Sequence, residues 1–512
     1  MKFSFYTDDI AKLSSALVGV VCFEEGLSES PTFQSIDRAL GGILAKLVTE
    51  EQFKGKKGQS LLLHTHGKVG AERVLLIGAG ARKDFQPYDL RGIAARIVRD
   101  GNKISAQSVA MVVPYTEGTV MERAAQFLAE GARLGAYKFD KYLTADKDEK
   151  DKKPAVEEFK ITLGSENGDA AKSDTIRNAV QRGERIAAAI AHARDLVNEP
   201  AAEMTPKKLA EIATRDAKQY GLEIKVLGPK ECEKLGMGMF LGVAQGSEEE
   251  PRLIHLIYRP RAVGGKAAAP RKKIALIGKG VTFDSGGLSL KPSAGMEDMK
   301  IDMAGAAAVI SAIGALADLS VPFEVHAVAA CTENMPSGKS YKLGDVLKSM
   351  NGKTVEINNT DAEGRLTLGD AMTYIIGEAK PDEMFDFATL TGACMVALGP
   401  HTAGVMGNDL SLVERWLAAA RLAGEEMWHL PLPEKLKEQL KSDIADMKNT
   451  GERWGGALTA GLFLKEFVGD TAWVHVDIAG PASSDKEAGH LTKGGTGFGV
   501  ATIVEYLAGR PA

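Results

Sequence analysis

Segments with the pattern of β-strands alternate with segments that have the pattern of helices along most of this 512-residue chain. In the first 170 residues, strand-like runs such as Ser60–His64 and Ser108–Val113 are separated by helical patterns such as Tyr88–Arg99 and Val120–Ala136. After residue 199 the alternation resumes, with apolar strands expected at Leu253–Tyr258, Ile274–Ile277, Glu324–Ala330 and Met384–Thr389. Strands that alternate with helices of this length are typical of α/β proteins, so we expect central sheets that are mostly parallel or mixed.

A long helical pattern from about Thr175 to Val197 divides the alternating segments into two groups, and Pro200 closes it. We therefore expect two α/β domains: an N-terminal domain over residues 1–170 and a larger C-terminal domain over residues 199–512. Residues 171–198 would form the helix that connects them. A further helix should begin at Pro206, with Thr205 as its N-cap.

The charge of the chain is nearly balanced, since 63 Lys and Arg oppose 68 Asp and Glu, which gives a net charge of −5. This balance argues against a protein that binds polyanions through bulk charge. The Lys-rich run from Lys147 to Lys153 also contains Asp and Glu, which favours a solvated loop over a nucleic-acid contact.

The longest nearly apolar stretch, Ala304 to Ala317, is shorter than the ~18–20 residues that a membrane-spanning helix needs. The first residues lack the sustained apolar run of a secretory signal. The four cysteines (Cys22, Cys232, Cys331 and Cys394) are far apart and show no CxxC spacing, which favours reduced thiols. We therefore expect a cytoplasmic protein that makes no membrane contact.

Two segments carry charge where the chain would otherwise bury apolar residues. The first runs from Ile277 to Asp302, begins at the end of an apolar strand and contains Lys279, Asp284 and Lys291. The second, NNTDAEGRL at 358–366, follows the strand-like residues 354–357 and precedes a helical pattern. Ligands in α/β sheets bind beyond the carboxyl ends of the strands, so both segments lie where a site is expected.

Asp361, Glu363 and Arg365 are spaced by two, so their side chains would point the same way if the segment were extended. A purely structural interpretation is also open. Thr360 and Glu363 have the spacing of a helix capping box, and Arg365 would then lie at the surface. Asp302 would in that case only favour the start of the next helix.

Four carboxylates in one crevice (Asp284, Asp302, Asp361 and Glu363) would either stay protonated or need cations. Two divalent ions would balance them, and oxygen ligands suit Zn, Mn or Mg. Paired metals ~3.5–4 Å apart are a known hydrolytic arrangement. A lysine beside such a centre either loses its proton and binds a metal, or stays charged and binds a developing oxyanion. Lys279 and Lys291 could divide these roles.

At these residues the sequence resembles the leucyl (cytosol) aminopeptidase family. NTDAEGRL at 359–366 matches the signature octapeptide of that family, and GKGVTFDSGGLSLKP at 278–292 matches its other metal-binding segment. Further agreement is found in NEPAAEMTP (198–206), ENMPSGKSY (333–341), ATLTGA (388–393), WGGALTAGLFLKEFV (454–468), WVHVDIAGPA (473–482) and GGTGFGV (494–500). The resemblance extends through the C-terminal part, which it implies to be the catalytic domain, and is weaker before residue 170.

The resemblance implies a leucyl aminopeptidase-type metallo-exopeptidase that holds two divalent ions, Mn²⁺ or Zn²⁺, in each subunit. One ion would be bound by Lys279, Asp284, Asp302 and Glu363. The other would be bound by Asp284, Asp361 and Glu363. Lys291 and Arg365 match the two catalytic positions, where Lys291 would polarise the scissile carbonyl and Arg365 would hold a bicarbonate that carries the proton.

The same resemblance implies peptide substrates with a Leu-like N-terminal residue, bound in a pocket near Met299, Thr389 and Gly392. It also implies a homohexamer built as a dimer of trimers. Two alternatives stay open. Some bacterial relatives have a DNA-binding regulatory role, and two-metal phosphoester hydrolases use similar carboxylates.

Overall fold

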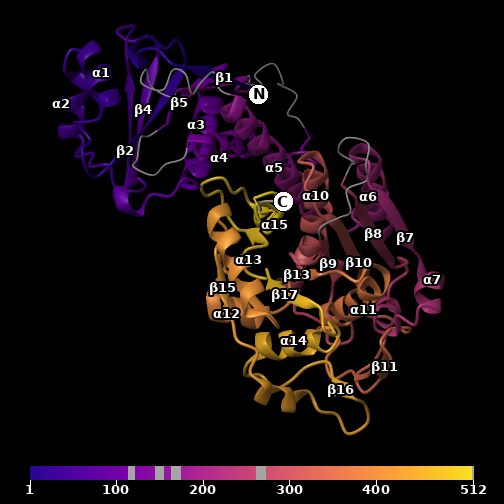
Figure 1. Cartoon of the computed structure of the whole chain (residues 1–512). Helices are drawn as coiled ribbons and strands as arrows, with labels where there is room; N and C mark the ends of the chain where they lie inside the picture. The colour runs from indigo at the N-terminus through magenta and orange to yellow at the C-terminus, as the bar shows by residue number, and fades with distance from the viewer. Residues whose placement is uncertain (114–120, 145–154, 163–173, 261–271, 510–512) are drawn as a thin grey trace. The chain divides into compact units, whose positions relative to one another are not determined.

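A computed structural model describes residues 1–113, 121–144, 155–162, 174–260 and 272–509 (Figure 1). The predicted solvated loop at Lys147–Lys153 lies outside these residues. The chain forms two compact units. The first contains Met1–Ala188 with Lys486–Thr492, and the second contains Ala189–Asp485 with Lys493–Ala512.

The first unit is built on a six-stranded sheet with the order β1-β6-β5-β2-β4-β3. All neighbouring strands are parallel except the pair β3 and β4. The strands are β1 (Lys2–Tyr6), β2 (Leu17–Phe23), β3 (Ser60–His64), β4 (Arg73–Gly80), β5 (Ser108–Val112) and β6 (Glu158–Thr162). The helices are α1 (Pro31–Ala39), α2 (Ile43–Glu50), α3 (Asp89–Lys103), α4 (Met121–Gly135) and α5 (Asp174–Asn198), which continues into the second unit.

Helices cover both faces of this sheet and form a separate apolar core on each. One core joins the sheet to α3 and α4 through residues such as Ile97 and Phe127. The other joins it to α1 and α2 through residues such as Phe33 and Leu44. Every residue of β2 is buried, as expected of a strand covered on both sides.

The second unit contains a mixed eight-stranded sheet with the order β15-β14-β17-β13-β9-β10-β8-β7. Its central pairs, β17–β13, β13–β9 and β9–β10, are parallel, and antiparallel pairs occur towards both edges. The strands are β7 (Glu223–Leu227), β8 (Arg252–Tyr258), β9 (Lys273–Asp284), β10 (Glu324–Asn334), β13 (Glu383–Ala388), β14 (Ala403–Gly407), β15 (Met427–His429) and β17 (Ala472–Asp477). The prediction of α/β domains with mostly parallel or mixed sheets is confirmed.

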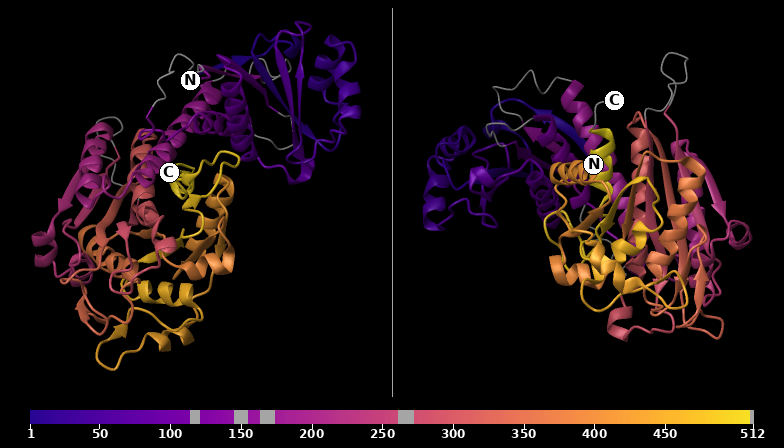
Figure 2. Two further views of the ribbon diagram at one scale, coloured as in Figure 1. Left: turned by 180° about the vertical axis from the view of Figure 1, so that it is seen from behind. Right: turned by 60° about the horizontal axis from the view of Figure 1, so that its bottom comes forward.

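Helices also lie on both faces of the second sheet (Figure 2). One group shares an apolar core with the sheet: α8 (Gly238–Ala244), α11 (Glu363–Ala379) and α14 (Gly456–Lys465). The other helices are α6 (Pro206–Tyr220), α7 (Pro229–Lys234), α9 (Ser293–Met296), α10 (Ala304–Asp318), α12 (Gly392–Leu398), α13 (Leu410–Ala423) and α15 (Val500–Ala508). Three short strands, β11 (Val346–Lys348), β12 (Thr354–Glu356) and β16 (Met447–Lys448), form a small separate sheet, and two two-residue strands, β18 (Ser483–Ser484) and β19 (Gly494–Gly495), pair with each other.

The local structure differs from the predicted elements at two places that matter here. β9 was expected to end at Ile277, yet it continues to Asp284, because its polar residues face a buried site instead of solvent. The sequence also has a helical pattern over Ile36–Val48, but the structure has two helices there, α1 and α2, since Gly41 and Gly42 both adopt positive φ angles. The predicted start of α6 is confirmed, with the Thr205 side chain accepting a hydrogen bond from the Lys208 amide.

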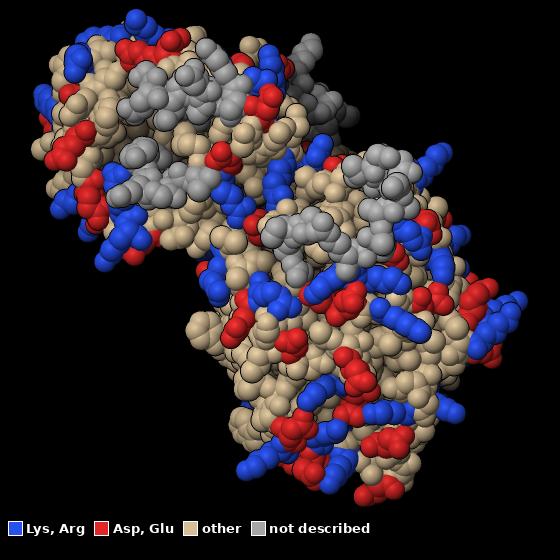
Figure 3. Space-filling model, viewed as in Figure 1, with Lys and Arg blue, Asp and Glu red and all other residues tan. Residues whose placement is uncertain are grey.

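One stretch of the described chain, Ser293–Asp318, is long and apolar enough to cross a membrane by length and composition alone. It contains α10, and 83% of its most apolar window is buried inside the protein. Burial on this scale is what a core helix of an α/β unit requires. On the face drawn in Figure 3, basic and acidic side chains of the described residues are interspersed.

A short return of the C-terminal chain, Lys486–Thr492, belongs to the first unit. There Arg99 of α3 donates hydrogen bonds to the carbonyl oxygens of Gly489 (2.5 Å) and Leu491 (2.9 Å), and it pairs with Glu487 at 3.2 Å.

Candidate active site

The predicted charged residues come together at the carboxyl ends of two central strands of the second unit. Asp284 ends β9, and its register partner on the parallel strand β10 is Asn334. Asp361 lies just before α11, and Glu363 is the first residue of that helix. The expectation that both charged segments meet beyond the strand ends is confirmed by this arrangement.

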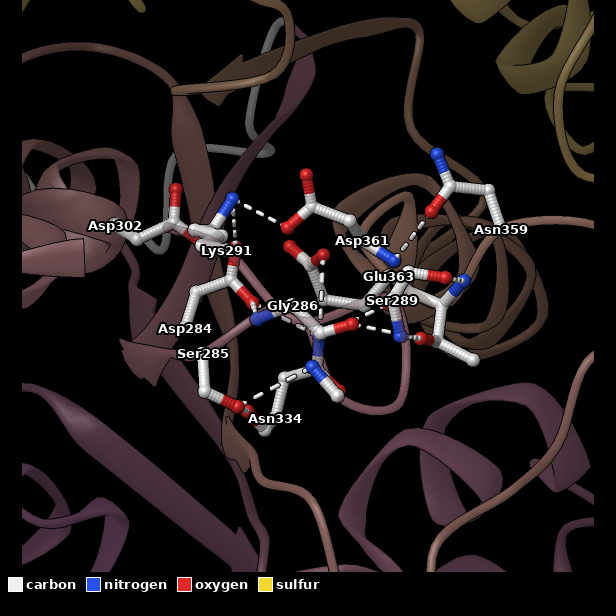
Figure 4. Close-up of polar contacts among 12 residues, drawn as sticks. Asp284, Ser285, Gly286, Ser289, Lys291, Asp302, Asn334, Asn359, Asp361 and Glu363 are labelled. Carbon is white, nitrogen blue, oxygen red and sulfur yellow. Dashed lines mark hydrogen bonds and ion pairs between the residues drawn. The ribbon is translucent and has the colours of Figure 1, made fainter. Parts of the chain in front are cut away.

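The carboxylates face one another closely (Figure 4). Asp284, Asp361 and Glu363 each offer an oxygen atom within 4.8 Å of those of the other two. Asp302, in the turn before α10, joins them through Lys279. Asp284, Asp302 and Glu363 are almost fully buried, with at most 4% of their surface exposed.

Two lysines neutralise part of this charge. The Lys279 Nζ atom lies 2.7 Å from Asp302 Oδ2, 2.8 Å from Glu363 Oε1 and 3.1 Å from the Thr389 carbonyl oxygen. Its side chain passes so close to α11 that a Cβ atom at Gly364 would lie 2.6 Å from Lys279 Cε, so a larger residue there would displace Lys279 from the cluster. The structure corrects the expected position of Lys279, which lies within β9 and not beyond its end.

Lys291 reaches the other side of the cluster. Its Nζ atom lies 2.9 Å from Asp284 Oδ2 and also pairs with Asp361. The loop that carries Lys291 turns back through Gly286 and Gly287, whose φ angles of +85° and +63° favour glycine.

Burial and charge shift the titration of this cluster. Burial raises the pKa values of Glu363 and Asp302, and the neighbouring Asp284 raises both further. Burial also raises the pKa of Asp361. Burial alone would lower the pKa values of Lys279 and Lys291, but the surrounding carboxylates outweigh it and raise both. Lys279 therefore needs the field of a bound cation before it can lose its proton.

Arg365 lies in the first turn of α11 and is 6% exposed, so the alternative of a surface position is excluded. Its Nη1 atom donates a hydrogen bond to the Asn449 carbonyl oxygen at 2.8 Å, whereas its buried Nε atom has no hydrogen-bond partner among the described residues. Burial lowers the pKa of Arg365 to about 10, so the guanidinium stays charged at neutral pH.

The prediction that Asp361, Glu363 and Arg365 point the same way in an extended segment is wrong, because β12 ends at Glu356, residues 360 and 361 form a turn, and α11 begins at Glu363. Glu363 and Arg365 lie in a helix, where a separation of two residues turns the side chain by about 200°. The alternative capping box is also wrong, because the N-cap of α11 is Ala362 and it makes no side-chain cap.

Thr360 instead joins the two charged segments. Its Oγ1 atom donates to the Gly286 carbonyl oxygen (2.7 Å) and accepts from the Ser289 amide (2.7 Å). Its own amide donates to Ser289 Oγ at 3.1 Å. These three hydrogen bonds hold the loop of Asp284 and Lys291 against the loop of Asp361 and Glu363.

Of the three residues expected to line a pocket, Thr389 contacts this cluster directly. Thr389 follows β13, and its Oγ1 atom donates to Asp302 Oδ1 at 2.6 Å, so its hydroxyl is bonded to a predicted metal ligand. Gly392 begins α12 at an exposed position, where an added Cβ atom would meet nothing within 4 Å. Met299 begins the turn that contains Asp302 and is partly exposed.

The residues of this cluster fit divalent cations. Three buried carboxylate oxygens each form an ion pair with a lysine: Asp302 Oδ2, Asp361 Oδ1 and Glu363 Oε1. Among the described residues they accept no other hydrogen bond. Carboxylate oxygens that are turned inward and close together are the donor set that Mn²⁺, Mg²⁺ or Zn²⁺ accepts.

Two buried residues of the site were not singled out from the sequence. Asn334 donates to Asp284 and to the Thr360 carbonyl oxygen. Asp477, at the end of β17, accepts hydrogen bonds from the Thr391 hydroxyl and from the amides of Leu390 and Thr391. Both end central strands on the side of the site, so the rule that placed Asp284 there could have identified them.

Comparison with known families agrees with the site. The model described as the cytosol aminopeptidase family, catalytic domain, matches residues 191–504, and that of the N-terminal domain of the same family matches residues 17–146. The chain belongs to the cytosol aminopeptidase family. The resemblance inferred from the sequence motifs is thereby confirmed. Because members of this family are metal-dependent aminopeptidases, the chain is an enzyme, a metallo-exopeptidase hydrolase.

Relatives by sequence and solved structures are similar to this protein over nearly the whole chain. A probable cytosol aminopeptidase of Alkaliphilus metalliredigens is 43% identical over 507 residues, which cover 99% of both chains. One from Aquifex aeolicus is 42% identical over 509 residues, covering 99% of this chain and 98% of the relative. A mutant of tomato leucine aminopeptidase has a similar structure, with a TM-score of 0.89, 34% identity and coverage of 100% and 97%. The bottromycin maturation enzyme BotP in complex with Mn gives a TM-score of 0.83 at 33% identity, covering 97% and 99%.

Proposed function

We propose that this enzyme uses two divalent metal ions to release N-terminal amino acids, preferably Leu-like ones, from peptides. The observation that carries the proposal is the largely buried cluster of four carboxylates and two lysines, in which three buried carboxylate oxygens have no partner among the described residues other than a lysine ammonium group. A buried set of like charges on this scale is stabilised by cations.

The proposed ligands of one ion are Lys279, Asp284, Asp302 and Glu363, and those of the other are Asp284, Asp361 and Glu363. The close approach of oxygens from Asp284, Asp361 and Glu363 supports this division. When bound, the two ions acidify water and polarise the scissile carbonyl. We propose Mn²⁺ or Zn²⁺; the similar BotP structure is described as a complex with Mn.

Lys291 and Arg365 are the proposed catalytic residues. Lys291 presents an ammonium group at the edge of the carboxylate cluster, where it can donate hydrogen bonds to an oxyanion that develops on the substrate. Arg365 cannot act as a base, because its guanidinium keeps its proton. Its unpartnered Nε atom supports the proposal that it binds bicarbonate, which would transfer the proton.

The proposed specificity pocket is formed by Met299, Thr389 and Gly392. The absence of a side chain at Gly392 leaves space for an apolar substrate side chain. Thr389 would connect this pocket to the metal centre through its hydrogen bond to Asp302. A binding site that recognises the side chain next to the reacting carbonyl explains a preference at the first residue of the peptide.

The decisive experiment is hydrolysis of leucine p-nitroanilide before and after chelation, followed by addition of Mn²⁺ or Zn²⁺. We expect chelation to abolish the release of p-nitroaniline and either metal to restore it. Activity that survives complete removal of metal contradicts the proposal. A parallel assay of p-nitrophenyl phosphate hydrolysis distinguishes a peptidase from a phosphoester hydrolase. We expect no hydrolysis of the phosphate ester.

We further propose a homohexamer, a dimer of trimers, in the cytoplasm. Large apolar side chains that are highly exposed in the second unit, including Val396 (90%), Trp428 (66%) and Trp454 (71%), support self-association. Light scattering after size-exclusion chromatography should give six times the 54.5 kDa mass of the chain. The interspersed charge on the face drawn in Figure 3 and the net charge of −5 give no support to a DNA-binding role.

A further inference from the structure

Asn334 lies beneath the carboxylate cluster and has no assigned role. It is the last residue of β10, is fully buried and is the register partner of Asp284 on β9. Its position at the base of the cluster is visible in Figure 4. A fully buried amide needs hydrogen-bond partners, and here the Nδ2 group has them, whereas the Oδ1 atom has none among the described residues.

Three acceptors surround the Nδ2 atom of Asn334. It donates to Asp284 Oδ1 at 2.8 Å and to the Thr360 carbonyl oxygen at 2.9 Å, and Glu363 Oε2 lies 3.5 Å away. These neighbours fix the orientation of the amide, because a flipped side chain would turn its oxygen towards three other oxygens. Since Nδ2 carries two hydrogens, the two short contacts are full hydrogen bonds and the contact to Glu363 is weaker.

The contacts distinguish the two oxygens of each carboxylate. Asp284 Oδ1 accepts from Asn334 and also from the Gly286 amide at 2.9 Å, whereas Asp284 Oδ2 faces Lys291. Glu363 Oε2 faces Asn334, whereas Glu363 Oε1 faces Lys279. Asn334 thus contacts one oxygen of each carboxylate, and the other oxygen of each faces a lysine.

We propose that Asn334 is a positioning residue that orients Asp284 and Glu363 for metal binding. The inference rests on the proposed function, in which these two carboxylates are shared by both ions. Residues that orient metal ligands from behind set metal affinity as well as reactivity. One amide that contacts both shared carboxylates couples their orientations, so its loss should weaken both metal sites together.

Support of the loop backbone alone does not account for the placement of Asn334. The Thr360 carbonyl oxygen also accepts a hydrogen bond from the Tyr341 hydroxyl at 2.7 Å, so the loop has a second support. Tyr341 is buried, and among the described residues its hydroxyl donates to this carbonyl oxygen and to no carboxylate of the cluster. Tyr341→Phe therefore removes support of the loop while leaving the carboxylates untouched, and it is the matched comparison for Asn334.

The test is titration of metal-free protein with Mn²⁺ alone in competition with a chelating dye, together with thermal unfolding with and without Mn²⁺. For Asn334→Ala we expect affinity for Mn²⁺ to fall about 10–100-fold and the stabilisation by Mn²⁺ to shrink accordingly. Tyr341→Phe should bind Mn²⁺ within about threefold of the wild type. Asn408→Ala, which removes an amide that supports the backbone at Thr471 and Trp473, should leave Mn²⁺ affinity unchanged.

Wild-type affinity for Mn²⁺ in Asn334→Ala overturns the inference, as does an equal loss in Tyr341→Phe. If Asn334→Ala does not fold, Asn334→Ser is compared with the wild type in the same way, because the serine side chain is too short for its hydroxyl to reach both carboxylates. The proposed function fails separately, when the wild-type protein itself binds no Mn²⁺ or Zn²⁺ or keeps its aminopeptidase activity without metal.

Discussion

Lys279 and Lys291 pair with different carboxylates of the cluster and lie in different surroundings. The side chain of Lys279 is 4% exposed, lies in the middle of the sheet and touches Asp302, Glu363 and the Thr389 carbonyl oxygen. The side chain of Lys291 is 17% exposed and lies on a loop. A lysine that reaches towards solvent can meet a substrate, whereas one sealed between strand and helix cannot. This difference supports the proposed division into a ligand and a catalytic group.

For Lys291→Ala we therefore expect metal content to be retained while kcat for leucine p-nitroanilide falls about 10²–10³-fold, as for loss of an oxyanion donor. Metal analysis and steady-state kinetics measure the two effects. Lys339→Ala is the matched control, because 79% of the Lys339 side chain is exposed and its acidic neighbour, Glu248, is itself exposed and lies 3.8 Å away. A near wild-type kcat in Lys291→Ala would rule out the proposed role.

At the scale of single residues, the sequence predicted the charged residues of the site but not the neutral ones. Asp284, Asp302, Asp361, Glu363 and the lysines stood out because charge in a buried segment is costly and requires a reason. Asn334 and Thr360 carry no charge, and amides and hydroxyls are common at turns. Their importance lies in contacts with residues at least 26 positions away in the sequence, which no local pattern encodes.

Secondary-structure elements place these residues with the precision that the chemistry requires. β9 and β10 run parallel for eleven register pairs, with one irregularity between Thr332 and Glu333, and end together at Asp284 and Asn334. The apolar pattern correctly located both strands but ended them too early, because it treats charged and polar residues as loop. Their last residues are buried by helix α11, a tertiary effect that overrides the local pattern.

The first turn of α12 offers a test of the proposed pocket. Gly392→Val places a branched side chain in open space without backbone strain, because its φ angle lies outside the left-handed region. We expect kcat/KM for leucine p-nitroanilide to fall about 10-fold or more, while that for alanine p-nitroanilide changes little, as for the loss of space for a few methylenes.

Gly377→Val in α11 is the matched control, because an added Cβ atom there also meets nothing within 4 Å and the residue lies in the last turns of the helix, far along it from Glu363. For Gly377→Val, the ratio of kcat/KM for leucine p-nitroanilide to that for alanine p-nitroanilide should equal the wild-type ratio. If the ratio of kcat/KM for the leucine substrate to that for the alanine substrate is unchanged in Gly392→Val, Gly392 does not line the specificity pocket.

On the scale of the whole molecule, the chain passes between its two units three times. It leaves the first unit after Ala188, returns at Lys486 and leaves again after Thr492. The returning segment is held by Arg99, whose hydrogen-bond partner Gly489 is 390 positions away in the sequence. Separations of this size carry no sequence signal, so the long helix around residues 175–197 was predicted but the return was not.

Arg99→Ala should loosen this returning segment. We expect the backbone amides of residues 486–492 to exchange with solvent deuterium faster, since the mutation removes two hydrogen bonds and an ion pair. Hydrogen-exchange mass spectrometry measures the effect. Arg96→Ala, on the same helix but bonded to Asp100 and Ser60, should leave exchange in this segment unchanged. Equal protection in Arg99→Ala would show that other contacts hold the segment.

The return of Lys486–Thr492 also has a consequence during synthesis of the protein. The first unit includes these seven residues, yet 304 residues (492 − 188) are translated after its main body is complete. At about 5–20 residues per second, the ribosome needs roughly 15–60 s to supply them. During that interval the surface of α3 around Arg99 and Gly92, which later meets Gly489, stays open to other contacts. The unit that emerges from the ribosome first is therefore completed only when nearly the whole chain has been made.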